Sequence, residues 1–272
     1  MKFIIAGCVR NSEVYIKHVF ENIKTICSII NVEKIVVAYD PSSDETLYEL
    51  MKQKKHSPID IQLLINKKPL TPHRTQNICN ARNELLQYIY GYTPKIDKFI
   101  MMDFDDVCSK PINVEVFKKS LDLDADCITF NNENYYDFWA LSLDNFEFSA
   151  WHLTRPRTYL NLSRNYLIKK ILASEKEYIE CDSAFNGLGI YKLDKFKDCK
   201  YQSLMDHNYY NQDKLDYIKK TYNLDIDITQ DPYDCEHRIY HFMAKKMNNA
   251  RIIIYKQFLF PVYTGPHTGF ID

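Results

Sequence analysis

Short apolar strands alternate with helical segments through the first 102 residues. Strand patterns cover residues 3–6, 34–38, 59–65 and 99–102, and helical spacing covers 12–30, 43–54 and 75–90 between them. Apolar strands separated by helices are typical of a parallel sheet that is covered on both faces. The sequence therefore predicts an α/β fold with an open, mostly parallel central sheet flanked by helices.

The pattern changes after Asp126. Strands are expected at 127–130, 183–191 and 251–255, and helices at 114–120, 161–173 and 233–247. The stretch 131–157 is rich in aromatic and polar residues, as a small subregion beside the sheet would be. No linker or internal repeat divides the chain, so one domain over residues 1–272 is expected.

Charge and cysteine usage exclude several classes of protein. The chain has 35 Lys+Arg and 36 Asp+Glu, a balance that creates no general field for nucleic acid. No segment approaches the ~20 apolar residues of a membrane span, and the apolar start is too short for a signal peptide. The eight Cys form no C-x-x-C pair, which argues against a zinc site or a disulfide framework. We therefore expect a soluble protein with no nucleic-acid partner and no membrane span.

The apolar run that begins at Lys98 ends in Asp103 and Asp105, and Asp106 follows. A strand would deliver these acids to its carboxyl end, where open α/β sheets bind ligands. Hard divalent cations on phosphate substrates take one or two carboxylates plus phosphate oxygens. The motif indicates a metal–diphosphate site, and a solvated acidic loop is the alternative.

Two further residues lie where they could meet such a ligand. Asp40 ends the second strand and could accept hydrogen bonds from a base or ribose, while helix capping by Ser43 or Asp44 explains part of the same motif. Arg82 lies on or beside the apolar face of a helix. It could meet a diphosphate, or it could form a salt bridge to a core acid.

The second half adds several candidates. Gly187 and Gly189 mark either a bulge or close approach by a ligand, beside the polar Asp182 and Asn186. Asp137, among aromatic residues, could hold a sugar or cap a turn.

Two candidates lie nearer the end of the chain. Glu236 opens a helix, where acids are favoured for structural reasons and where a catalytic base could also stand. His267, between two glycines, is either inert or a metal ligand beside the aspartates.

These motifs, in this order, resemble GT-A (Rossmann-like) glycosyltransferases over most of the chain. Asp103-Phe104-Asp105 looks like the metal-binding D-x-D of that fold, and Asn186-Gly187-Leu188-Gly189 is similar to its acceptor loop. Asp234-Cys235-Glu236 resembles its acidic helix-start motif, and His267 its C-terminal metal ligand. Within the fold, the capsule-associated α-1,3-mannosyltransferases are most similar, through residues 10–13, 40–46, 80–83, 136–139, 185–187 and 235–237.

The resemblance implies transfer of a sugar from a UDP- or GDP-hexose to a hydroxyl of a glycan or glycoprotein, with Mn²⁺ or Mg²⁺ as cofactor. Residues 1–126, approximately, would bind the nucleotide sugar, and residues 127–272 the acceptor. Glu236 or Asp182 would deprotonate the acceptor in an inverting reaction, and a retaining reaction would need no protein base. The implied metal ligands are Asp103, Asp105 and His267, and the implied donor contacts are Asp40, Arg82, Asp103, Asn186 and Gly187.

Fungal relatives carry an N-terminal membrane anchor, and this chain shows none. A cytoplasmic location is expected, which for a viral chain would be the host cytoplasm or the virion. Two alternatives stay open: a non-catalytic nucleotide-sugar or glycan-binding protein, and a sugar-phosphate nucleotidyltransferase. The latter class usually opens with a Gly-rich basic loop, whereas residues 7–11 contain one glycine. Donor, acceptor, linkage and oligomeric state are left open.

Overall fold

The computed structural model describes residues 1–132, 135–227 and 232–260. Within these ranges the strands form one eight-stranded sheet in the order β3-β2-β1-β4-β7-β5-β8-β6. The strands are β1 (Lys2–Val9), β2 (Asn31–Tyr39), β3 (Ile61–Ile65), β4 (Lys98–Met102), β5 (Cys127–Asn131), β6 (Tyr178–Cys181), β7 (Leu188–Lys192) and β8 (Ile252–Phe258).

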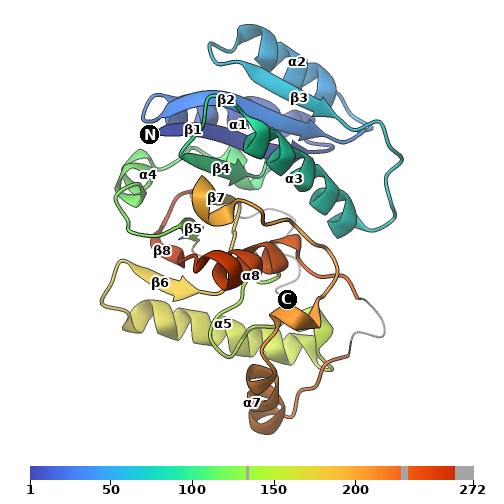
Figure 1. The fold of residues 1–272 in the computed structure, drawn as a ribbon, viewed down its shortest axis with the longest axis vertical. Coiled ribbons are helices and arrows are strands. Elements are labelled where there is room, and N and C mark those ends of the chain that lie inside the picture. The colour runs from blue at the N-terminus through green and yellow to red at the C-terminus, as the bar shows by residue number, and fades with distance from the viewer. Residues whose placement is uncertain (133–134, 228–231, 261–272) are drawn as a thin grey trace.

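Helices cover both faces of this sheet. They are α1 (Glu13–Cys27), α2 (Thr46–His56), α3 (Arg74–Gly91), α4 (Val114–Ser120), α5 (Pro156–Ala173), α6 (Leu193–Phe196), α7 (Gln212–Tyr222) and α8 (Glu236–Asn248). Successive side chains of a strand point to opposite faces. Along β1, Ile4 therefore packs in the apolar cluster of α3 and α8, and Ile5 in that of α1, α2 and α4. In Figure 1, α3 and α8 lie on the near side of the sheet.

Parallel pairs join β3, β2, β1 and β4, and a further parallel pair joins β5 to β8. The pairs of β7 with β4 and β5, and of β6 with β8, are antiparallel. The predicted α/β fold with an open, mostly parallel sheet flanked by helices is confirmed. No helix in the described part of the chain is long and apolar enough to cross a membrane.

The connection order reverses between β1 and β4. The chain adds β2 and then β3 on one side of β1, and it returns to place β4 on the other side. In open α/β sheets, ligands bind outside the carboxyl ends of the strands at such a switch point. Asp40, Asn66 and Asp103 follow the carboxyl ends of β2, β3 and β4.

Two stretches differ from the expected elements. The strand expected at 183–191 begins only at Leu188, because Asn186 and Gly187 have φ angles of 57° and 94°, which break an extended chain. The helix expected from 233 begins at Glu236. Neither β6 nor α7 was expected from the sequence.

Candidate functional site

The loop after β4 carries the two aspartates of the D-x-D motif. Asp103 donates its backbone N–H to the carbonyl of Gly187 at 2.9 Å, and Asp105 Oδ1 accepts from Val107 N at 3.1 Å. Between them, the buried Phe104 ring lies against Gly7 of β1, where an added Cβ would come within 2.3 Å of the ring. The absent side chain at Gly7 therefore lets Phe104 fix this loop on the sheet.

Arg82 of α3 joins the loop to the start of α8. Its side chain is only 5% exposed; Nη2 donates to Asp103 Oδ1 at 2.9 Å, and Nη1 donates to Glu236 Oε1. The guanidinium carbon also lies 4.7 Å from the ring centroid of Phe185 and 5.7 Å from that of Tyr201. Of the two interpretations of Arg82, the structure supports the salt bridge, which Arg82 forms with both Asp103 and Glu236.

His237 completes the surroundings of this guanidinium. Its ring stacks on Phe185 with centroids 3.9 Å apart, and its Nε2 contacts Arg82 Nη1. Burial, then the charges of Arg82 and His241, hold the pKa of His237 far below its usual value, so the ring is neutral and Nε2 accepts from the guanidinium. No local pattern predicts this role, because in sequence His237 looks like any residue of a first helical turn.

Asp137 and Asn186 form the side of the site next to β5 and β7. Asp137 Oδ2 accepts from Asn186 N, and Asn186 Oδ1 accepts from Asp137 N, both at 3.4 Å. Asn186 Nδ2 also donates to the carbonyl of Phe130 at 3.0 Å. Through Gly187, which accepts from Asp103, this pair is continuous with the loop after β4.

Negative charge dominates the site. Burial, followed by the charge of Asp105, raises the pKa of Asp103 well above its usual range, although Arg82 opposes the shift; Asp137 and Glu236 add to it. Burial raises the pKa of Asp137 as well, and the charge of Glu236 adds to that shift. Asp103 and Glu236 share one guanidinium, that of Arg82, so an added cation would stabilise this group of carboxylates.

A divalent cation fits this donor set. Asp103 and Asp105 supply hard oxygen ligands, which suit Mn²⁺ or Mg²⁺ when phosphate oxygens complete the coordination shell. Within the described ranges, no three His, Cys, Asp or Glu side chains are already grouped to hold a metal ion. The third predicted ligand, His267, lies outside the described residues.

Asp40 lies at the same edge of the sheet, beside Asn66. Its Oδ1 accepts from Asn66 Nδ2 at 2.8 Å, and it is largely buried. Asp44 caps the start of α2, since its Oδ1 accepts from Thr46 N at 3.1 Å. Asp40 itself therefore remains available for the ligand role that its strand position indicates.

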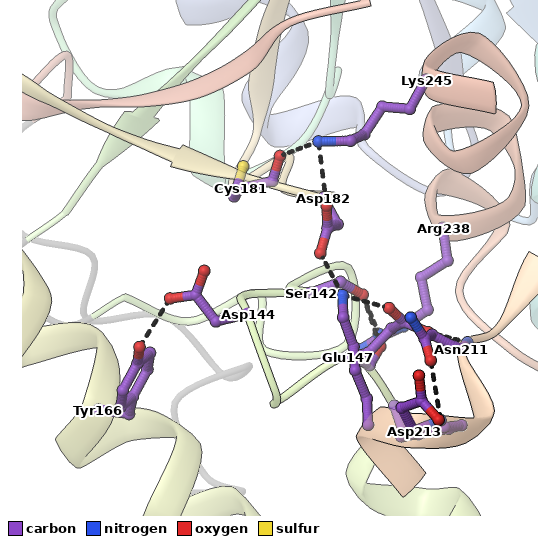
Figure 2. Close-up of polar contacts among 12 residues, drawn as sticks. Ser142, Asp144, Glu147, Tyr166, Cys181, Asp182, Asn211, Asp213, Arg238 and Lys245 are labelled. Atoms are coloured by element: carbon purple, nitrogen blue, oxygen red, sulfur yellow. Dashed lines mark hydrogen bonds and ion pairs between the residues drawn. The ribbon is translucent and has the colours of Figure 1, made fainter. Parts of the chain in front are cut away.

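Asp182 lies in a different group of charges (Figure 2). Its carboxylate pairs with Lys214 at 2.8 Å and with Lys245 at 3.0 Å. Burial alone would raise the pKa of Asp182, but the two lysines hold it below its usual value. The structure thus brings Arg82, Asp103, Asn186, Gly187 and Glu236 into one bonded group and places Asp182 in another.

Arg238 links the two groups of residues. It is fully buried, and its Nε donates to the carbonyl of Trp139 at 2.7 Å and lies 3.3 Å from Asp234 Oδ1. Further N–H groups reach Ser142 Oγ and the carbonyl of Glu147 (Figure 2). Arg238 therefore fastens the segment after Asp137 to the first turn of α8, which carries Glu236.

Three solved structures illustrate what the chain is similar to. A mannosyltransferase from Pyrobaculum calidifontis, PcManGT in complex with GDP-Man and Mn²⁺, matches at 12% identity and TM-score 0.44, over 74% of this chain and 47% of that one. TarS from S. aureus matches at 15% identity and TM-score 0.48, over 98% of this chain and 38% of that one. Glucosyl-3-phosphoglycerate synthase from Mycobacterium tuberculosis, in complex with UDP, matches at 10% identity and TM-score 0.40, over 72% of this chain and 58% of that one.

In each of these matches the chain spans less than two thirds of the other chain's own length. No protein-family model and no curated protein matches the chain.

Proposed function

We propose that this chain is a metal-dependent glycosyltransferase of the GT-A fold. It moves a hexose from a UDP- or GDP-hexose to a hydroxyl of a glycan or glycoprotein acceptor. One observation carries the proposal: Asp103 and Asp105 follow β4 at the switch point of the sheet, and Arg82 bonds Asp103 and Glu236 together there. One guanidinium thus holds a carboxylate proposed for the metal–diphosphate and a carboxylate proposed for the acceptor.

The donor side is assigned to the carboxyl ends of the parallel strands. Asp103 and Asp105, with His267 from the C-terminal segment, are the proposed ligands of Mn²⁺ or Mg²⁺. Such an ion, when bound, would supply positive charge to the diphosphate leaving group. Asp40, held by Asn66 at the ends of β2 and β3, would bind the nucleoside.

Arg82 takes a different role from the donor contact that the resemblance implies. Its guanidinium is nearly enclosed and already serves two carboxylates. We assign it the task of holding Asp103 and Glu236 in position. Of the two proton acceptors considered for an inverting reaction, Glu236 is favoured, because Arg82 bonds it into the same group as Asp103. Asp182 lies in a different group, with Lys214 and Lys245.

The first test is nucleotide release. The purified chain is incubated with a panel of UDP- and GDP-hexoses and Mn²⁺, with EDTA as one control. We expect release from one donor, which EDTA abolishes and Asp105→Asn lowers by about 100-fold or more. Asp122→Asn makes the same substitution at an exposed aspartate next to α4 and should leave the rate unchanged.

Other outcomes separate the alternatives. Metal-dependent binding of a nucleotide sugar without release would support a binding protein. Pyrophosphate release from a nucleoside triphosphate plus a sugar phosphate would support a nucleotidyltransferase. Neither binding nor turnover with any of these compounds would refute the metal–diphosphate site itself.

A further inference from the structure

The carboxylate of Asp137 has acceptor capacity that the fold does not use. Oδ1 accepts from Ala140 N at 3.1 Å, and Oδ2 accepts from Asn186 N at 3.4 Å. Both donors are backbone N–H groups, and an ionised carboxylate offers about four acceptor positions. The side chain is half-buried, so a ligand can reach it.

The turn that presents Asp137 is fixed from two sides. Asn186 holds the backbone N–H of Asp137 while it adopts a left-handed φ of 57°, a conformation that costs energy in a non-glycine residue. On the other side, the buried Arg238 binds the carbonyls of Phe138 and Trp139. A residue that merely capped a turn would need only the bond from Ala140.

Asp137 differs from the other acids of the site in its partners. Asp103 and Glu236 share Arg82, whereas no Lys, Arg or His of the described ranges forms an ion pair with Asp137. The same site also holds unused donors: Arg82 Nε and His237 Nδ1 are buried and find no hydrogen-bond partner among the described residues. Buried polar groups are normally satisfied, so this part of the protein has hydrogen-bonding capacity that its own residues do not use.

We propose that Asp137 accepts a hydrogen bond from a sugar hydroxyl of the substrate and thereby helps to select the sugar. The inference rests on the proposed function and adds a specificity-determining residue to it. Its location supports a sugar, because Asn186 and Gly187 connect Asp137 directly to Asp103, beside which the diphosphate would lie. The hydroxyl belongs either to the donor sugar or to the acceptor.

The test compares Asp137→Asn with Asn186→Gly. The resemblance gives Asn186 as a donor contact, but its side chain already bonds Asp137 N and the Phe130 carbonyl, so we assign it to holding the turn. Glycine adopts a positive φ without strain, so Asn186→Gly removes these side-chain bonds and keeps the backbone bond to the Asp137 carboxylate. Calorimetry in Mn²⁺ gives the Kd of UDP, GDP and each nucleotide hexose, and nucleotide release gives the rate. Loss of a hydrogen bond to a charged group corresponds to about 10- to 100-fold.

A donor hydroxyl predicts that Asp137→Asn weakens binding of the nucleotide hexose by this factor and leaves the nucleotide diphosphate unchanged. An acceptor hydroxyl predicts unchanged donor binding and a slower transfer. In both cases Asn186→Gly should reduce the affected quantity, donor affinity or transfer rate, clearly less than Asp137→Asn does. Asp137→Glu, which keeps the charge but moves it, should show the same pattern as Asp137→Asn and serves if the latter fails to fold.

Equal losses in Asp137→Asn and Asn186→Gly would overturn the inference, because Asp137 would then only hold the turn. If Asp137→Asn weakens binding of the nucleotide diphosphate and of the nucleotide hexose equally, the inference is also overturned. Asp137 would then be a metal ligand. If the wild type is active and Asp137→Asn binds and transfers equally well, this inference is rejected and the proposed function stands. A wild type that neither binds nor cleaves any donor rejects the proposed function, and this inference falls with it.

Discussion

At Arg82, one enclosed positive charge serves two carboxylates that the chain brings from distant positions. Asp103 is 21 residues away in sequence and Glu236 is 154 residues away. No other Lys or Arg in the described part of the chain forms an ion pair with either acid. Breaking a buried ion pair by removing one member is strongly destabilising, because the other member is left as an uncompensated charge.

Replacing Arg82 with methionine should therefore lower the free energy of unfolding by about 3–5 kcal/mol. Urea denaturation at pH 7 in EDTA measures it. Arg82→Lys keeps the charge and should lose less. The double variant Arg82→Met, Glu236→Gln should recover part of the loss, since one of the two unpaired charges is gone; no recovery would contradict this account.

At the scale of elements, α1 and α2 cap each other. Asp44 Oδ2 accepts from Glu13 N at 3.1 Å while its Oδ1 accepts from Thr46 N, so one carboxylate caps both helices. In return, Glu13 Oε2 accepts from Glu45 N at 3.1 Å and Thr46 Oγ1 accepts from Ser12 N at 2.7 Å. First-turn N–H groups have no partner within their own helix, so this exchange satisfies both starts.

Asp44→Ala should lower the free energy of unfolding by about 1–2 kcal/mol at pH 7, as measured by urea denaturation. Burial alone would raise the pKa of Asp44, but hydrogen bonds from Thr46 and Glu13 hold it below its usual value. A depressed carboxyl pKa stabilises the fold above the unfolded-state value and loses this effect on acidification, so the cost should shrink below about pH 4. Glu49→Ala removes a first-turn acid of α2 that pairs with Lys52 but caps no N–H group of the described residues, and it should lower the free energy of unfolding by under about 0.5 kcal/mol at both pH values.

Strand β1 carries a second testable constraint, at Gly7. An alanine Cβ there would meet Phe104 at 2.3 Å and the Met102 carbonyl at 2.4 Å, so Gly7→Ala should destabilise by about 1–3 kcal/mol. Thermal unfolding checks this against Gly91→Ala at the end of α3, where an added Cβ meets nothing within 4 Å. Equal melting temperatures for the two variants would show that Phe104 can move aside.

Local patterns account for what the sequence predicted. The strands and helices of the first half follow from apolar period and length, whereas β6 was missed because four residues that include Glu180 carry too little pattern. The Arg82–Glu236 contact spans 154 residues, which no local pattern encodes. For Asp137 the sequence left two alternatives open, a sugar contact and a turn cap. His237 was indistinguishable, in sequence, from an ordinary helical residue.

At the scale of the whole molecule, the two halves of the chain join in one sheet, where β4 of the first half pairs with β7 of the second. Strand β7 lies between β4 of the first half and β5 of the second, with ladders to both. The apolar cluster under α3 and α8 also takes residues from both halves. Neither half can then lose its strands without exposing the core of the other.

We therefore expect a single cooperative unfolding transition. Both Trp residues, Trp139 and Trp151, lie in the second half, so their fluorescence reports on that half, whereas far-ultraviolet circular dichroism reports on the whole chain. The two signals should give coincident urea curves. A fluorescence transition at lower urea than the dichroism transition would show that the halves unfold separately.

The enclosure of Arg82 has a consequence for how this chain can diverge. A lineage that loses Arg82 first keeps Asp103 and Glu236 as two carboxylates without the cation that they share. That step is therefore penalised, and a replacement that also changes the acids is not. Among descendants, these three positions should vary as a set, as correlated changes at sites that the sequence itself keeps far apart.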